Sequence, residues 1–126
     1  MAITNKVYKS RLQKWLDNLR SGKYSKGENV LRQVENGKCK HCVLGVAVET
    51  FNENNPKEKI QYDESLGFKG IGIGYIPAKV RKWFGLTYRS EENLVAYNDC
   101  ENKTFKQIAY HMERCPHLYF EWAKDK

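Results

Sequence analysis

The sequence predicts an α+β fold in which about four helices pack on a small sheet of short strands. Apolar residues recur at helical spacing near the start, before the middle and near the end of the chain. Between these stretches lie short runs bounded by glycine and Asn-Gly turn signals, which is typical of strands. The chain of 126 residues has the length of one domain, and we expect residues 1–126 to form it.

The first predicted helix covers residues 5–21. Its apolar residues form one face at helical spacing: Tyr8, Leu12, Trp15, Leu16 and Leu19. Thr4 or Asn5 can cap its start, and Gly22 stands where a left-handed glycine ends many helices. We therefore expect this face in the core and the lysines of the helix in solvent.

Short strands and one buried helix are predicted next. Residues 30–34 lie between turn signals and are expected to be extended. Residues 42–51 are apolar on more than one side, which predicts a buried helix, and Gly45 inside it indicates the close approach of another backbone. The glycine-rich residues 66–75 predict an irregular or bulged strand.

The second half of the chain is predicted to hold two more helices. A short one is expected over residues 76–86, and a longer one, with Thr104 as its N-cap, over residues 104–115. Between them, residues 93–99 are predicted to be extended and to end in a turn. The aromatic residues after Pro116 either pack back on the domain or cover a neighbouring subunit.

Positive charge is concentrated in the first third of the chain. Residues 1–42 hold ten lysines and arginines and three acids, so the whole net charge of +7 lies there. A one-sided positive field attracts polyanions such as nucleic acid, phosphorylated small molecules or an acidic protein face. The alternative is a solvated basic helix that only aids solubility.

The basic segment, residues 19–32, is the strongest functional signal. Its arginines and lysines can bind phosphate, its tyrosine can stack on a base, and Gly22 and Gly27 can expose backbone N–H groups to an anion. A predicted polar turn further along the chain can bind sugar hydroxyls or base edges. The candidate ligand-binding residues are Arg20, Lys23, Tyr24, Lys26, Arg32, Asn98 and Asp99.

Four cysteines leave a metal site open as an alternative. Cys39 and Cys42 have the spacing of a zinc half-site, and His111 with Cys115 can supply the other half. The competing interpretation is that Cys42 begins an apolar helix and is a buried, reduced thiol. We assign no metal ligand and expect no cofactor, with structural zinc kept as the alternative.

The chain lacks the motifs of the common hydrolases. No G-x-S-x-G, H-E-x-x-H or P-loop pattern is present. His41, His111 and His117 keep open the metal-free cleavage of a phosphodiester by general acid–base catalysis. Because each histidine is also ordinary at a surface or a helix cap, we assign no catalytic residue and do not expect an enzyme.

A membrane location is not expected either. No apolar run approaches the roughly 20 residues that cross a bilayer. The first residues lack the apolar core of a signal peptide. We therefore expect a cytoplasmic protein without a membrane partner.

The order of several motifs resembles a family of small, uncharacterised phage and prophage proteins. These motifs are Leu19-Arg20-Ser21-Gly22-Lys23-Tyr24, Leu31-Arg32, Cys42-Val43-Leu44-Gly45-Val46 with Glu49, Pro77 through Leu86, Asn98-Asp99, and Phe105 with Ile108-Ala109. Val43 stands where the family pattern has a second cysteine, which argues against an essential thiol pair. The resemblance implies an accessory protein that works in a bacterial host cell, against or alongside host factors.

Three functions are compatible with these observations. The favoured one is an anti-defence protein that sequesters, without turnover, a phosphorylated nucleotide immune signal such as a cyclic ADP-ribose or a cyclic dinucleotide. A site shared between subunits would suit so short a chain, so a homo-oligomer is expected. The alternatives are a nucleic-acid-binding phage protein, and a phosphodiesterase or protein inhibitor of a host factor.

Overall fold

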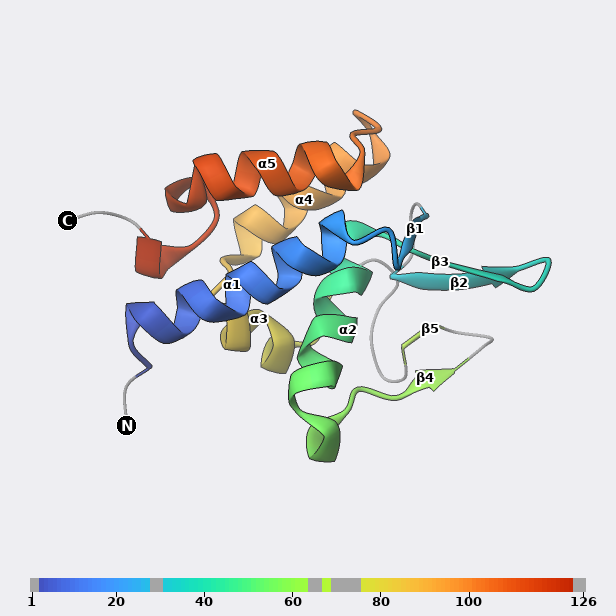
Figure 1. The fold of residues 1–126 in the computed structure, drawn as a ribbon, viewed down its shortest axis with the longest axis horizontal. Coiled ribbons are helices and arrows are strands. Elements are labelled where there is room, and N and C mark those ends of the chain that lie inside the picture. Colours follow the sequence, from blue (N-terminus) through green and yellow to red (C-terminus); the bar gives the residue numbers. More distant parts are fainter. Residues whose placement is uncertain (1–2, 28–30, 64–66, 69–75, 124–126) are drawn as a thin grey trace.

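Five α-helices and two small sheets make up the part of the chain that the computed structural model describes, residues 3–27, 31–63, 67–68 and 76–123 (Figure 1). The helices are α1 (Asn5–Arg20), α2 (Val43–Asn54), α3 (Ala78–Phe84), α4 (Tyr88–Asp99) and α5 (Phe105–Arg114). Three short 3-10 turns cover Pro56–Glu58, Pro116–Leu118 and Glu121–Ala123. The predicted α+β class is confirmed. None of the helices within these ranges has the length and apolar content needed to cross a bilayer.

The strands are short. They are β1 (Ser25–Lys26), β2 (Arg32–Glu35), β3 (Lys38–His41), β4 (Tyr62–Asp63) and β5 (Gly67–Phe68). In the larger sheet β3 lies in the centre, parallel to β1 and antiparallel to β2, and the β2–β3 ribbon extends away from the helices (Figure 1). β4 and β5 form a separate antiparallel pair, and most of the predicted strand over residues 66–75 lies outside the described residues.

The helix α1 lies in the middle of the fold, packed against α2, α3 and α5 (Figure 1). Thr4 caps it as expected, and its predicted apolar face is buried from Leu12 to Leu19. Trp15 is fully buried and its Nε1 donates to the carbonyl of Val43 at 3.2 Å. The sequence therefore placed α1 and its inner face correctly.

The predicted close approach at Gly45 is confirmed. A Cβ atom at this position would lie 1.8 Å from the carbonyl oxygen of Leu31. The same carbonyl accepts the backbone N–H of Cys42 at 3.2 Å. The chain before β2 thus lies directly on the first turn of α2, and only glycine leaves room for it.

The prediction of an extended segment at residues 93–99 is wrong, because these residues form the second half of α4. Thr87 caps this helix by accepting from the backbone N–H of Ser90 at 3.0 Å. The inward positions include Ser90, Glu91 and Asn98, each 2% exposed or less. A buried face made largely of polar residues has no apolar period, so the helical pattern was hidden.

The aromatic tail packs back on the domain, one of the two predicted arrangements. Tyr119 and Phe120 are 2% and 0% exposed. Leu86 and Phe120 form an isolated antiparallel bridge, and Trp122 Nε1 donates to the carbonyl of Phe84 at 2.9 Å. The tail therefore covers α3 and the turn that follows it.

Candidate functional site

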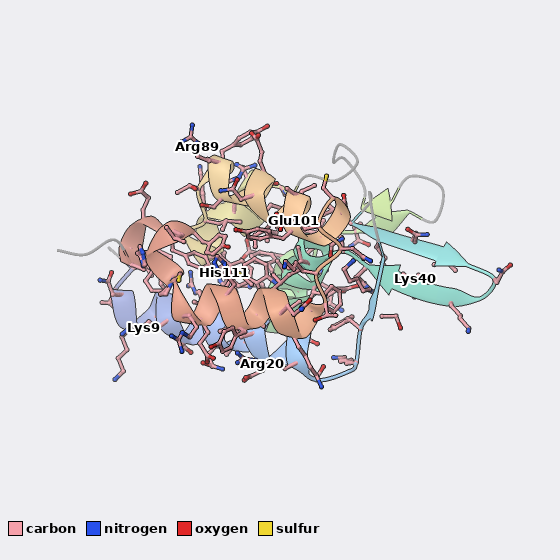
Figure 2. All side chains as sticks on the ribbon, turned by 90° about the horizontal axis from the view of Figure 1, so that it is seen from above. Lys9, Arg20, Lys40, Arg89, Glu101 and His111 are labelled. Carbon is pink, nitrogen blue, oxygen red and sulfur yellow. The ribbon has the colours of Figure 1, made fainter. Side chains whose placement is uncertain are left out.

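Arg20, the first residue of the predicted site, joins two helices. Its guanidinium forms a two-pronged ion pair with Glu113 of α5, with N–O distances of 2.7 and 3.3 Å. The hydrogen bonds to Glu113 raise the pKa of Arg20, and the same bonds lower the pKa of Glu113. Figure 2 shows Arg20 near the end of α1, below α5. This cation thus has an anionic partner within the protein.

Lys23 and Tyr24 converge on Glu53 of α2. Lys23 Nζ lies 2.5 Å and the Tyr24 hydroxyl 3.2 Å from the same carboxylate oxygen. Burial and then the charge of Glu53 raise the pKa of Tyr24 to about 12. Burial opposes ionisation of Glu53, but hydrogen bonds from Lys23 and Asn18 keep its pKa below the ordinary value. Tyr24 is therefore a neutral hydrogen-bond donor at neutral pH.

Lys26 and Arg32 belong to one row of the larger sheet. Both pair with His41 of β3, Lys26 from β1 and Arg32 from β2. His41 Nε2 lies 2.8 Å from a Glu49 oxygen, and Arg32 Nε lies 3.8 Å from the same oxygen and 3.0 Å from Cys39 Sγ. Glu49 and Glu53 are one turn apart on α2, so this helix supplies carboxylates to much of the basic segment.

The side chain of Lys26 reaches the end of α4. Its Nζ lies 2.8 Å from the carbonyl oxygen of Asn98 and 3.1 Å from Oδ1 of Asn102. A positive charge at this place interacts favourably with the C-terminal end of a helix. Lys26 therefore fixes the turn between α4 and α5.

Asn98 lies in a helix and is fully buried, so its predicted place in a polar turn is wrong. Its Oδ1 accepts the backbone N–H of Val43 at 3.1 Å, and its Nδ2 donates to the carbonyl of Gly27 at 2.9 Å. Nδ2 also lies 2.7 Å from Oδ1 of Asp99, the last residue of α4. Asn98 thus connects α4 to the start of α2 and to the end of β1.

A hollow of about 540 Å³ lies between α4 and α5 and opens to the surface. Tyr97 of α4, together with Tyr110 and His111 of α5, supplies its aromatic rings. Two lysines, Lys103 and Lys106, lie along its wall. Figure 2 shows His111 between α5 and the helices behind it. This volume is within the range of small-molecule sites, which are commonly several hundred Å³.

Further polar side chains complete this wall. Glu101, in the turn after α4, and Gln107, in the first turn of α5, both line the hollow (Figure 2 labels Glu101). The two lysines outnumber the single carboxylate, so the residues that line the pocket carry a net positive charge. An aromatic, acceptor-rich and anionic ligand fits this combination.

Two tyrosines, Tyr97 and Tyr119, fix the position of the His111 ring. Its Nδ1 is hydrogen bonded to the hydroxyl of Tyr119, and the rings of Tyr97 and Tyr119 both meet it edge-on. Burial, followed by a hydrogen bond with Tyr97, raises the pKa of Tyr119. The His111 ring is therefore fixed in orientation before any ligand binds.

A second hollow, of about 710 Å³, lies between α1, α5 and the tail. Lys6 and Lys9 line it on the α1 side and Trp122 on the tail side. Although it is larger, its lining contains one aromatic ring, against three in the hollow between α4 and α5. The α4–α5 pocket is thus the better candidate for a planar ligand.

The two predicted halves of a zinc site are not brought together. Across the described ranges of the chain, no group of three or more His, Cys, Asp or Glu residues is placed to hold a metal ion. Cys42 is buried, and burial raises the pKa of its thiol to about 11. All four cysteines are free thiols.

Sequence reasoning missed the pocket residues other than His111. Lys103, Lys106 and Tyr110 form a basic–aromatic run much like the predicted segment. The run lies in the part of the chain where the charges cancel, so the concentration of positive charge directed attention elsewhere. Tyr97 joins the run only because α4 packs on α5.

One comparison with known proteins gave a match. A family model described as a domain of unknown function, DUF8296, matches residues 8–115. No curated protein and no solved structure shows significant similarity to the chain.

Proposed function

The chain belongs to the DUF8296 family, and we propose that it binds a small phosphorylated nucleotide, without turnover, in the pocket between α4 and α5. The observation that carries this proposal is the pocket itself, which combines three aromatic rings with two lysines in about 540 Å³. A base can stack on Tyr97 or Tyr110. Lys103 and Lys106 can meet the phosphate as point charges.

The state of the basic segment supports this choice of pocket. Arg20, Lys23 and Arg32 lie against carboxylates of α2 and α5, at 2.7, 2.5 and 3.8 Å. A phosphate at this segment has to displace those carboxylates, whereas the α4–α5 pocket is hollow. We therefore assign the ligand to the pocket and a supporting role to the segment.

Lys26 connects the segment to the pocket. It binds the end of α4 at Asn98 and Asn102, directly beside the pocket residues Glu101 and Lys103. Loss of this lysine is expected to loosen one wall of the pocket without removing any of its lining residues.

The biological role follows from the resemblance to phage and prophage proteins. We propose that the protein acts in the cytoplasm of a bacterial host and sequesters a nucleotide signal of host immunity, such as a cyclic ADP-ribose or a cyclic dinucleotide. To sequester the signal, the protein needs only to bind the nucleotide tightly, and no catalytic group is required. A second copy of the chain over the open side of the pocket would enclose the ligand, as expected for a homo-oligomer.

The test is isothermal titration calorimetry with nucleoside monophosphates, ADP-ribose, cyclic ADP-ribose and cyclic dinucleotides, followed by chromatography of the recovered ligand. We expect one ligand per chain, recovered intact. The variants Lys103→Ala and Lys106→Ala should each lose about tenfold in affinity. Lys9→Ala, in the larger hollow, is the matched control and should bind like the wild type.

Two outcomes contradict the proposal. Consumption of the ligand would make the protein an enzyme. Binding that falls steeply with salt and is equally strong for any DNA would favour the nucleic-acid alternative.

A further inference from the structure

We propose that the ligand of the α4–α5 pocket carries two linked phosphoryl groups, and that two fixed donors one helical turn apart, Gln107 Nε2 and His111 Nε2, each bind one of them. The inference rests on the proposed function and narrows its ligand class. It rests on two observations: the capping box at the N-terminus of α5, and the hydrogen bond between His111 and Tyr119.

Gln107 is oriented by the cap of α5. Thr104 and Gln107 form a capping box, in which Gln107 Oε1 accepts the backbone N–H of Thr104 at 2.9 Å and Thr104 Oγ1 accepts that of Gln107 at 3.1 Å. Because a backbone N–H can only donate, the amide oxygen must face Thr104. The amide nitrogen, with two N–H groups, is the part of Gln107 available to the pocket.

His111 is oriented by Tyr119. A phenol O–H is a stronger acid than a neutral imidazole N–H, and an imidazole nitrogen is a stronger base than a phenol oxygen. The hydroxyl has a single proton and also interacts with Tyr97, and it gives that proton to Nδ1 because the imidazole nitrogen is a stronger base than the Tyr97 oxygen. This leaves the ring proton of His111 on Nε2. Tyr119 is 2% exposed, so water does not compete for this hydrogen bond. His111 thus lines the pocket, and its ring nitrogen that is not bonded to Tyr119 carries an N–H donor.

The two donor side chains start one turn apart on the same face of α5, so they can reach neighbouring phosphoryl groups of one ligand. Residues four apart on a helix have Cβ atoms about 5–6 Å apart on the same face. Lys103 and Lys106 precede them along the same wall, so the positive and donor groups of α5 and the turn before it outnumber the single carboxylate there, Glu101. A nucleoside diphosphate or a pyrophosphate-bridged sugar nucleotide offers the oxygens of two linked phosphoryl groups to such a pair of donors, whereas a monophosphate offers the oxygens of one.

The first test is the tautomer of His111 in the free protein. Two-bond ¹H–¹⁵N NMR correlations distinguish the Nε2–H from the Nδ1–H form without any ligand. We expect the Nε2–H tautomer in the wild type and its partial loss in Tyr119→Phe. A wild-type ring protonated on Nδ1 overturns the assignment of this donor.

The second test compares AMP, ADP and ADP-ribose on the wild type and Gln107→Glu. Glutamate keeps the capping box but replaces the two N–H donors by a charged oxygen, so folding should be unchanged. We expect Gln107→Glu to lose about 30-fold for the two diphosphoryl ligands and threefold or less for AMP.

The outcomes separate the two proposals. Equal loss for all three ligands, or tighter binding of AMP than of ADP by the wild type, overturns the diphosphoryl inference but leaves nucleotide binding in place. Absence of binding of any tested nucleotide overturns both the proposed function and the inference.

Discussion

Asn98 Oδ1 accepts the backbone N–H of Val43 at 3.1 Å, so the last turn of α4 caps the first turn of α2. Its Nδ2 satisfies the carbonyl of Gly27 at the same time. One buried amide thereby holds a helix and a strand that lie far from it in the sequence.

Replacing Asn98 by Ala should destabilise the fold by about 2–4 kcal/mol, because two buried backbone groups lose their partner. Urea unfolding followed by circular dichroism measures this change. Asn93→Ala, on the exposed side of the same helix, is the control and should change stability by less than about 0.5 kcal/mol. An Asn98→Ala variant as stable as this control would show that the amide is not a structural connection.

Gly45→Ala should prevent folding or cost more than about 3 kcal/mol. The new methyl group would lie 1.8 Å from the carbonyl oxygen of Leu31, which cannot move without breaking its hydrogen bond from Cys42. Gly22→Ala tests the contribution of backbone conformation alone, because no atom lies within 4 Å of the added Cβ at its φ of +80°. That variant should cost about 1–2 kcal/mol. In thermal unfolding, the melting temperature of Gly45→Ala should therefore lie well below that of Gly22→Ala.

Acid should weaken the contact between Glu53 and the Lys23–Tyr24 pair. Hydrogen bonds hold the pKa of Glu53 below its ordinary value of 4.5. A carboxyl with a lowered pKa stabilises the fold above its unfolded pKa, and this contribution is lost as the pH falls through the folded value. Since the group is largely exposed, the effect should stay under about 1 kcal/mol.

Thermal unfolding between about pH 6 and pH 3 measures this dependence. Glu53→Gln should lose less stability on acidification than the wild type. Identical pH profiles for the two proteins would mean that the pair contributes nothing to folding.

The four thiols should react in a fixed order with iodoacetamide at about pH 8. Cys100 is exposed and should be labelled first. Cys42 is buried, and with a pKa of about 11 it should be labelled only after denaturant is added. Peptide mass spectrometry over time resolves the order. Early labelling of Cys42 in native protein would show that the first turn of α2 opens readily.

The sequence predicted the elements whose buried faces are apolar. The helices α1, α2 and α5 repeat Leu, Val, Phe or Ile at helical spacing, and each was found with an end close to its true position. The helix α4 was missed because Ser90, Glu91 and Asn98 occupy its buried face. Polar residues are buried there because each has a hydrogen-bond partner, which no local pattern reveals.

The candidate site was harder to predict for the same reason. The carboxylates that face the basic segment lie on α2 and α5, up to 93 residues from their partners. From the sequence alone, unpaired and paired cations look identical. The pocket likewise needs Tyr97 and His111 on different helices, and only the packing of α4 on α5 joins them.

The position of α1 has a consequence for how the protein is made. Among the described residues α1 is the first helix and α5 the last α-helix, and the two pack together, with Arg20 paired to Glu113 near the end of α5. During synthesis α1 therefore leaves the ribosome long before its partner, with its apolar face uncovered on that side. A message truncated before α5 yields a chain that cannot complete its core and is exposed to proteolysis.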